Sequence, residues 1–256
     1  MLKGIKLFSL FLGTGFLLAS CFAPEKTVTK DYEETFDGIK EIELEGKFLE
    51  VTYEGKSGET EVYLNAYLEA AESSGMEITY RKSGSKLKIE VTGDMEIGWN
   101  FGNRTDGYIS LTGPEDIELN LTNGSGSIDV LNVVHENINL KVNSGSIKAT
   151  SLEVGDIQLN ASSGSISGEA LTGKVNCKVN SGSISLKDVV GNIDAVASSG
   201  SLKYCRAAAT TAGSISATVR RAWSSWLSVS ACAASVSAST TLFSASRARR
   251  TSSSCV

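Results

Sequence analysis

The chain has 256 residues, 41% of them hydrophobic, which is enough to bury a core, and its two Pro against 25 Gly favour many short strands over long helices. Its formal net charge of −5 disfavours nucleic acid as a partner, because such binding depends on clustered Lys and Arg. A single His restricts nucleophilic-triad chemistry, which needs a base, to one position.

The first twenty residues are typical of a secretory signal. Lys3 and Lys6 precede an apolar run, residues 7–18, that is too short to span a bilayer. The run ends in Leu18-Ala19-Ser20-Cys21, which has the form of a bacterial lipobox. We therefore predict that Cys21 is acylated and becomes the mature N-terminus; the alternatives are an ordinary cleaved signal with a chance Cys, or an uncleaved anchor.

Lipidation of Cys21 would tether the protein stably, since lipobox processing normally adds more than one acyl chain. Phe22 follows the Cys in place of Asp, which in a bacterium with two membranes indicates the outer membrane or cell surface. Without residues 1–20 the chain keeps 22 basic and 29 acidic residues, a net charge of −7. Residues 21–35 are charged and poor in apolar side chains, so we predict a solvated tether there.

From residue 36 to about 120 the hydrophobic pattern has period two. Ile42 and Leu44, for example, are flanked by glutamates, and four similar sets follow, each bounded by a break that contains Gly. This alternation is typical of strands with one wet face, and it predicts an N-terminal strand-rich region over 36–120. Residues 64–71 stay open between strand and turn.

Three aromatic residues lie among the glycines near position 100: Trp99, Phe101 and Tyr108. One interpretation is a turn whose aromatic side chains cover one end of the sheet. The other is an exposed loop that stacks on a glycan or binds a partner.

A tetrapeptide, Ser-Gly-Ser followed by Ile or Leu, returns five times between residues 121 and 204. Its glycines are 19, 19, 18 and 18 residues apart, at Gly126, Gly145, Gly164, Gly182 and Gly200. A fixed period near 20 indicates a repeat architecture in which stacked units share one core.

The parity of the apolar positions shows where each unit turns. Val142 and Ile147 are five residues apart, so a straight strand would place them on opposite faces. The chain must turn at Ser-Gly-Ser, where Gly tolerates positive φ, and a second corner is expected near Gly155, Gly173 and Gly191. The prediction is an all-β fold: a β-solenoid of 18–19-residue rungs, each with two strands and two corners.

The lipobox, the alternating N-terminal strands and the S-G-S-I units together resemble the bacterial putative-adhesin family. This is a domain of unknown function found on secreted, membrane-anchored and lipidated surface proteins. The resemblance covers about residues 36–204 and implies a β-solenoid; it specifies fold far better than activity.

Residues 205–256 differ from the rest of the chain, with six Arg, one Gly and no Lys, Asp or Glu. The repeat period also fails there. One hypothesis is a frameshift near Cys205, which would leave a tail of low order; the alternative is a genuine basic low-complexity tail that binds acidic surface polymer. An unbroken reading frame, with expressed protein that ends at Val256, would refute the frameshift.

The sequence contains no recognisable catalytic, metal or cofactor motif. His135 lies at a corner beside Glu136, which is typical of a solvated residue, although partner contact is a second interpretation. Cys177 falls in an apolar column and is predicted to be a small buried hydrophobic residue. Carboxylates that could serve sugar chemistry are scattered over the repeats: Asp129, Glu153, Asp156, Glu169, Asp188 and Asp194.

We therefore expect a lipid-anchored, non-enzymatic envelope protein that binds a polysaccharide or protein and needs no cofactor. An envelope-stress or regulatory accessory protein with a membrane partner is the alternative. A polysaccharide-cleaving β-helical enzyme is the remote one.

Overall fold

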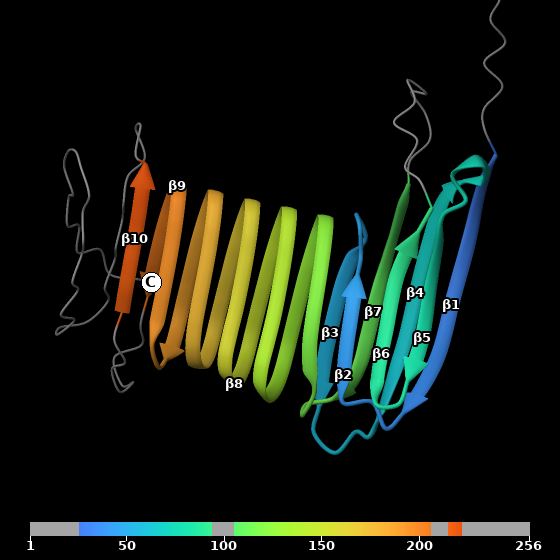
Figure 1. The fold of residues 1–256 in the computed structure, drawn as a ribbon, viewed down its shortest axis with the longest axis horizontal. Helices are drawn as coiled ribbons and strands as arrows, with labels where there is room; N and C mark the ends of the chain where they lie inside the picture. Colours follow the sequence, from blue (N-terminus) through green and yellow to red (C-terminus); the bar gives the residue numbers. More distant parts are fainter. Residues whose placement is uncertain (1–25, 94–104, 206–214, 222–256) are drawn as a thin grey trace, which may run out of the picture.

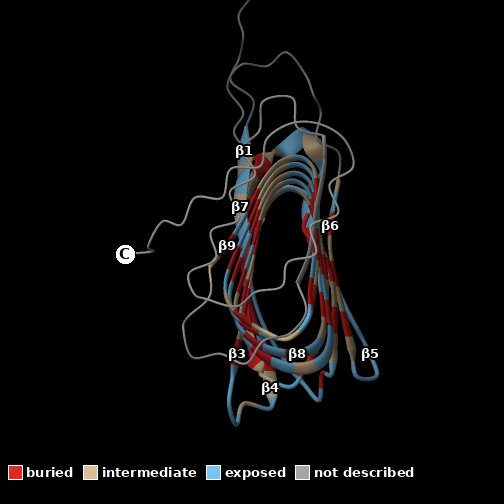
Figure 2. Ribbon diagram, turned by 90° about the vertical axis from the view of Figure 1, so that its left-hand side faces the viewer, coloured by how far each residue is buried: buried red, intermediate tan, exposed pale blue. Residues whose placement is uncertain are grey.

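A computed structural model describes residues 26–93, 105–205 and 215–221 of the chain. The fold is all-β, and the 3-10 turn η1 (Glu72–Ser74) is the one helical element within these residues. The strands form a mixed sheet that winds into a flattened tube (Figures 1 and 2). The predicted all-β, solenoid-like architecture is thus confirmed.

Seven strands build the N-terminal end of the tube, and three continue it. The first group comprises β1 (Thr27–Asp37), β2 (Glu41–Glu45), β3 (Glu50–Lys56), β4 (Glu61–Ala71), β5 (Glu77–Ser83), β6 (Lys86–Thr92) and β7 (Asp106–Pro114). The second comprises the long winding β8 (Glu118–Val190), then β9 (Ile193–Cys205) and β10 (Ile215–Arg221). Residues 64–71, left open between strand and turn, belong to β4.

The tube has two long faces that meet at rounded ends. The A face contains the stretches of β8 and β9 before each Ser-Gly-Ser, continued by β2, β6 and β5; the B face contains the stretches after it, continued by β3, β7, β4 and β1. Ile42 lies opposite Leu119 on the A face, and Val51 lies opposite Ile128 on the B face. The N-terminal strands therefore extend both faces of the solenoid and belong to the same domain.

The predicted inward residues fill the tube. Their alternation with outward polar residues gives each strand one buried and one wet face, and Figure 2 shows buried positions recurring along the walls of the ring. On the A face these buried residues are Ile138, Leu140, Val142, Ile157, Leu159, Ala161, Val175, Cys177, Val179, Ile193, Ala195 and Ala197.

Glycine at the Ser-Gly-Ser corner is required by contact between neighbouring turns of the chain. Gly164 has a φ of +143°, and a Cβ atom there would lie 1.7 Å from the carbonyl oxygen of Gly145. A Cβ at Gly182 would lie 1.7 Å from the oxygen of Gly164, and the same holds for Gly200 against Gly182. The backbones thus stack so closely at this corner that no side chain fits between them.

The opposite end of the ring contains a bend that the sequence pattern did not predict. Asn132, Ser151, Ala170 and Asp188 all adopt left-handed backbone conformation, with φ between +52° and +55°. After Ala170 comes buried Leu171 and then Gly173, where a Cβ would meet the oxygen of Val154 at 1.7 Å. This end is therefore turned by two bends around one inward side chain, where a single glycine corner was expected.

The N-terminal end of the tube is closed by contacts between its two outermost strands, β1 and β5. The backbone N–H of Ile78 donates to the Tyr32 hydroxyl at 3.2 Å, and Lys30 Nζ donates to the carbonyl of Met76, the residue before β5, at 3.1 Å. The rings of Phe36 and Tyr80 meet edge to face with centroids 5.6 Å apart. Side chains of the two edge strands thus bond part of the backbone at this end, which makes it a poorer template for pairing with other chains.

Two segments form strands that the sequence analysis did not predict. Residues 27–35, expected to be tether, belong to β1, which pairs antiparallel with β4 and packs Tyr32 against the core. Their charges misled the prediction, because half-buried Val28, Lys30, Tyr32 and Phe36 are interspersed among exposed polar residues. Within the tail expected to have low order, β10 pairs parallel with β9, Ile215 opposite Ile193.

Candidate functional site

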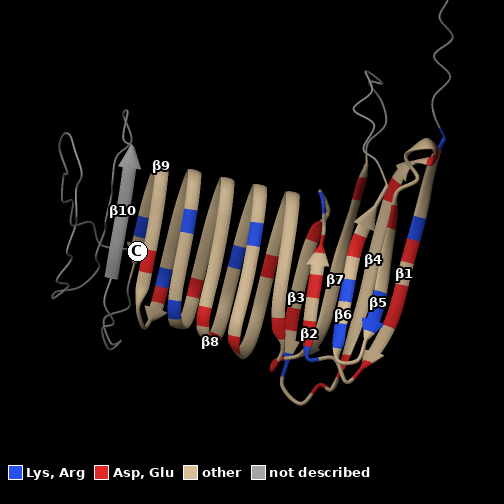
Figure 3. Cartoon of the chain, in the orientation of Figure 1, with Lys and Arg blue, Asp and Glu red and all other residues tan. Residues whose placement is uncertain are grey.

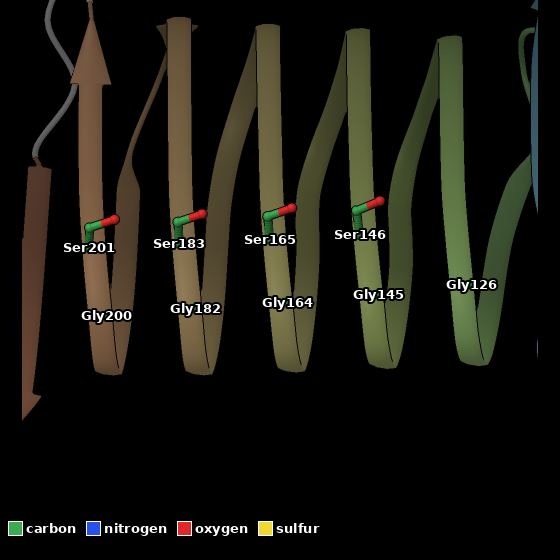
Figure 4. Close-up of a pocket in the computed structure, with 9 residues that line it drawn as sticks. All are labelled: Gly126, Gly145, Ser146, Gly164, Ser165, Gly182, Ser183, Gly200 and Ser201. Carbon is green, nitrogen blue, oxygen red and sulfur yellow. The ribbon is translucent and has the colours of Figure 1, made fainter.

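A shallow groove runs along the tube beside the Ser-Gly-Ser corners. It has a volume of about 620 Å³. The groove is lined by Gly126, Gly145, Gly164, Gly182 and Gly200 and by Ser146, Ser165, Ser183 and Ser201. Figure 4 shows the four serine hydroxyls pointing the same way, one on each successive strand. Because neighbouring strands lie ~4.8 Å apart, the hydroxyls form a regular row along the axis.

The glycines matter to this groove as well as to the corner. Because glycine has no side chain, the backbone at the floor of the groove stays accessible and nothing projects from it into the groove. Hydroxyl groups both donate and accept hydrogen bonds, and the row therefore suits a polar chain lying along the tube axis.

A second hollow, of about 430 Å³, lies on the A face just before the same corners. Its polar lining consists of Lys141, Lys178, Asn160, Asn180, Ser162 and Ser198. Exposed serines separate it from the groove, in a column made of Ser144, Ser163, Ser181 and Ser199. We call the groove, this serine column and the hollow together the corner surface.

The lysines of the solenoid differ in their partners. Lys148 pairs with Asp129 at 3.3 Å and Lys174 with Asp156 at 3.4 Å, in each case linking neighbouring turns of the chain. Among the described residues, Lys141 and Lys178 have no carboxylate within ion-pair distance. Their ammonium groups therefore remain available to an external acceptor.

The structure describes two of the four residues singled out for partner contact, and it does not bring them together. His135 lies at an exposed corner, where its Nδ1 is 3.2 Å from the backbone nitrogen of Asn137. Tyr108 is exposed on the outer side of β7. Trp99, Phe101 and the predicted lipidation site Cys21 lie outside the described residues.

The model of the Toastrack DUF4097 family matches residues 39–254. The chain belongs to the Toastrack DUF4097 family. This agrees with the resemblance drawn from the S-G-S-I units.

Solved structures similar to this Toastrack chain include three bacterial proteins. One is described as a putative cell adhesion protein from Clostridium sporogenes: 10% identity, TM-score 0.40, covering 70% of this chain and 100% of that one. Another is a putative adhesin from Bacteroides fragilis, at 16% identity and TM-score 0.44, covering 76% and 94%. The third is a putative lipid binding protein from Parabacteroides distasonis, at 17% identity and TM-score 0.35, covering 75% and 93%. No curated protein matches the sequence.

The thiol of Cys177 in this Toastrack chain is not placed for chemistry. It is fully buried, as predicted, and burial raises its pKa to about 12. A buried neutral thiol of this kind behaves as a small hydrophobic group. Over the described ranges, no group of three or more His, Cys, Asp or Glu side chains is arranged to hold a metal ion. Nor does that part of the chain contain a helix long and apolar enough to cross a membrane.

Sequence reasoning missed two outward tyrosines of the Toastrack fold, Tyr63 and Tyr67. Both lie on β4, on the same outer side as Tyr108. The signal was present, since residues 61–69 alternate strictly between inward apolar and outward polar or aromatic side chains.

Proposed function

We propose that this Toastrack chain is a non-catalytic binding protein of the bacterial cell envelope, anchored through a lipid on Cys21. Its β-solenoid, wound in rungs of 18–19 residues, contacts polysaccharide or another protein through the corner surface. In a bacterium with two membranes the protein resides at the outer membrane or cell surface, and it uses no cofactor.

The groove with its row of hydroxyls is the observation that carries the proposal. A row repeated along the axis offers the same weak contact several times to a long chain, and linked weak contacts add up to strong attachment. The two unpaired lysines beside it add charge to the same surface. The inward side chains are buried in the core and the corner glycines pack against neighbouring turns, so the outward side chains are the ones that can contact a ligand.

Binding of the full chain to polysaccharide isolated from the producing cells tests the proposal. We expect Ser165→Val with Ser183→Val to weaken binding at least tenfold, because both hydroxyls leave the groove. Ser167→Val with Ser185→Val is the matched control, since these serines lie on the same turns but outside the groove lining. Equal binding by both double variants would contradict the proposal.

Location and anchoring are tested separately. Mass spectrometry of the mature protein is expected to show acyl chains on residue 21, and Cys21→Ser is expected to release the protein from membranes. Protease treatment of intact cells is expected to cleave the protein. Full protection, together with copurification of one membrane protein, would favour the regulatory accessory role over adhesion.

A further inference from the structure

Three tyrosines stand on the outer side of the B face, near the N-terminal end of the tube. Tyr67 of β4 lies directly opposite Tyr108 of β7, and their rings stack with centroids 6.2 Å apart and planes at 25°. Tyr63 lies four residues earlier on β4. Tyr63 and Tyr108 are each 42% exposed, high values for aromatic side chains on an otherwise polar face.

These tyrosines are held in place by hydrogen bonds of their hydroxyl groups and by the pairing of their strands within the sheet. The Tyr108 hydroxyl donates to Asn65 Oδ1 at 2.9 Å, and the Tyr67 hydroxyl donates to Glu69 at 3.0 Å. Strands β4 and β7 are also internal to the sheet, each paired on both sides. The rings therefore lose little further conformational freedom when a ligand settles on them.

Carboxylates flank the stacked pair on three sides, and Asn65 and Ser110 lie on the fourth. Asp31 of β1 lies opposite Tyr67, and Glu50 of β3 lies opposite Tyr108. One step along the two central strands, Glu69 and Asp106 face each other. Figure 3 shows acidic residues recurring on these N-terminal strands.

Basic residues are scarce on the same outer side. Over the outward positions of the described strands β1, β4, β7 and β3, the basic side chain is Lys56, at the far end of β3, where it pairs with Glu54 at 4.0 Å. The hydrogen bond to Glu69, followed by desolvation and then by the charges of Glu69, Asp31 and Asp106, raises the pKa of Tyr67. The field over the rings is thus negative, which repels anionic polymers and attracts cations.

We infer that this tyrosine site, formed by Tyr67, Tyr108, Asp31, Glu50, Glu69 and Asp106, binds a glycan that carries free amino groups, such as a partly deacetylated hexosamine chain. The apolar faces of the sugars pack on the tyrosine rings, and the ammonium groups meet both the ring faces and the carboxylates. The inference rests on the proposed function, in which the protein contacts envelope polysaccharide, and it names one ligand class at a second site.

The position of the site favours a glycan over a basic peptide. Extended peptides commonly bind by adding a strand to a free sheet edge, and both strands here are internal. A chain that crosses the strands meets a new outward side chain every ~4.8 Å, comparable with the length of one sugar in an extended glycan. Asn65 and Ser110, which lie opposite each other beside the rings, can bond the sugar hydroxyls.

Calorimetry with the full chain in detergent tests the inference, using a glucosamine hexamer, an N-acetylglucosamine hexamer and polygalacturonate as probes. We expect the glucosamine hexamer to bind at least tenfold more tightly than the other two, and added salt to weaken it. Tyr108→Ala is expected to weaken that binding at least tenfold, whereas Tyr108→Phe, which keeps the ring, stays within twofold of the native chain.

Three results would overturn the inference. The first is equal affinity for both hexamers, and the second is unchanged binding by Tyr108→Ala in a chain that melts at the native temperature. Tighter binding of a lysine-rich peptide than of the glucosamine hexamer at these rings would also overturn it, in favour of a protein partner.

Failure of the proposed function gives a different pattern. If Ser165→Val with Ser183→Val abolishes binding to envelope polysaccharide and the native chain does not bind the glucosamine hexamer, the inference is refuted and the proposed function stands. If the hexamer binds through Tyr108 and the corner serines have no effect, the corner-surface proposal falls and the tyrosine site stands.

Discussion

Replacing Gly164 by Ala probes the stacked glycine corner where it is tightest. The new Cβ would lie 1.7 Å from the oxygen of Gly145, and the backbone cannot relax alone, because Gly182 packs against the oxygen of Gly164 on the other side. The φ of +143° adds strain for any L-residue. Overpacking costs about 1–3 kcal/mol and the backbone strain about 1–3 kcal/mol, so we expect a loss near 4 kcal/mol.

For a domain of this size each kcal/mol shifts Tm by about 2–4 °C, so the Gly164→Ala chain should melt about 8–16 °C below the native one. Far-ultraviolet circular dichroism, which follows the strands, measures the shift. Gly38→Ala is the matched control: φ is +60°, but no atom lies within 4 Å of the added Cβ. Its strain of about 1–2 kcal/mol predicts a shift of only a few degrees.

The comparison isolates the contact between turns. If Gly164→Ala and Gly38→Ala melt within about 2 °C of each other, a margin of under about 1 kcal/mol, close stacking contributes nothing and the glycines serve only to allow positive φ. The explanation of the Ser-Gly-Ser period given above would then be wrong.

Three further results are expected. Iodoacetamide at mildly alkaline pH should leave Cys177 unmodified in the native chain and alkylate it after denaturation, as peptide mass spectrometry will show, because burial raises its pKa to about 12. Tyr53→Phe should lower the free energy of unfolding in urea by about 1–2 kcal/mol, since the Tyr53 hydroxyl donates to the Pro114 carbonyl at 2.7 Å; no loss would mean that water replaces the bond. The Glu43 carboxyl accepts a hydrogen bond from Lys86, which lowers its pKa below 4.5, so its contribution is present above that pH and is lost as the pH falls through the folded-state pKa. The difference in Tm between the native chain and Glu43→Gln should therefore shrink as the pH is lowered through that range, and a constant difference would contradict this account.

Much of the fold could be predicted because its information is local and periodic. The alternation around Ile42 and the five-residue step from Val142 to Ile147 fix which side chains point inward, whatever the neighbouring strand is. Because the Ser-Gly-Ser unit returns five times, the inward positions and the corner predicted for one unit apply to all five. Burial of Cys177 followed from its column alone.

The errors arose where the information is not local. Pairing of β1 with β4 joins Thr27 to Ala71, and no short-range pattern in residues 27–35 reports that partner. The left-handed bend at Asn132 recurs at Ser, Ala and Asp, so no single residue type marks it. The stacked tyrosines could be suspected from the outward positions of β4, but only the register of β4 against β7 brings Tyr67 beside Tyr108.

The two proposals assign different roles to the periodic part and to the N-terminal part of the tube. In the solenoid every inward residue and corner glycine is committed to packing, and the outward side chains repeat, which favours many weak contacts along an axis. At the N-terminal end the same two faces are continued by strands without a repeat, and there the outward positions hold different side chains in a fixed arrangement. On these proposals, the repeated surface gains affinity with the length of the polymer, and the unrepeated one selects for its chemical groups. The corner surface is therefore the place to look for attachment to a polymer, and the tyrosine site is the place to look for selection among polymers.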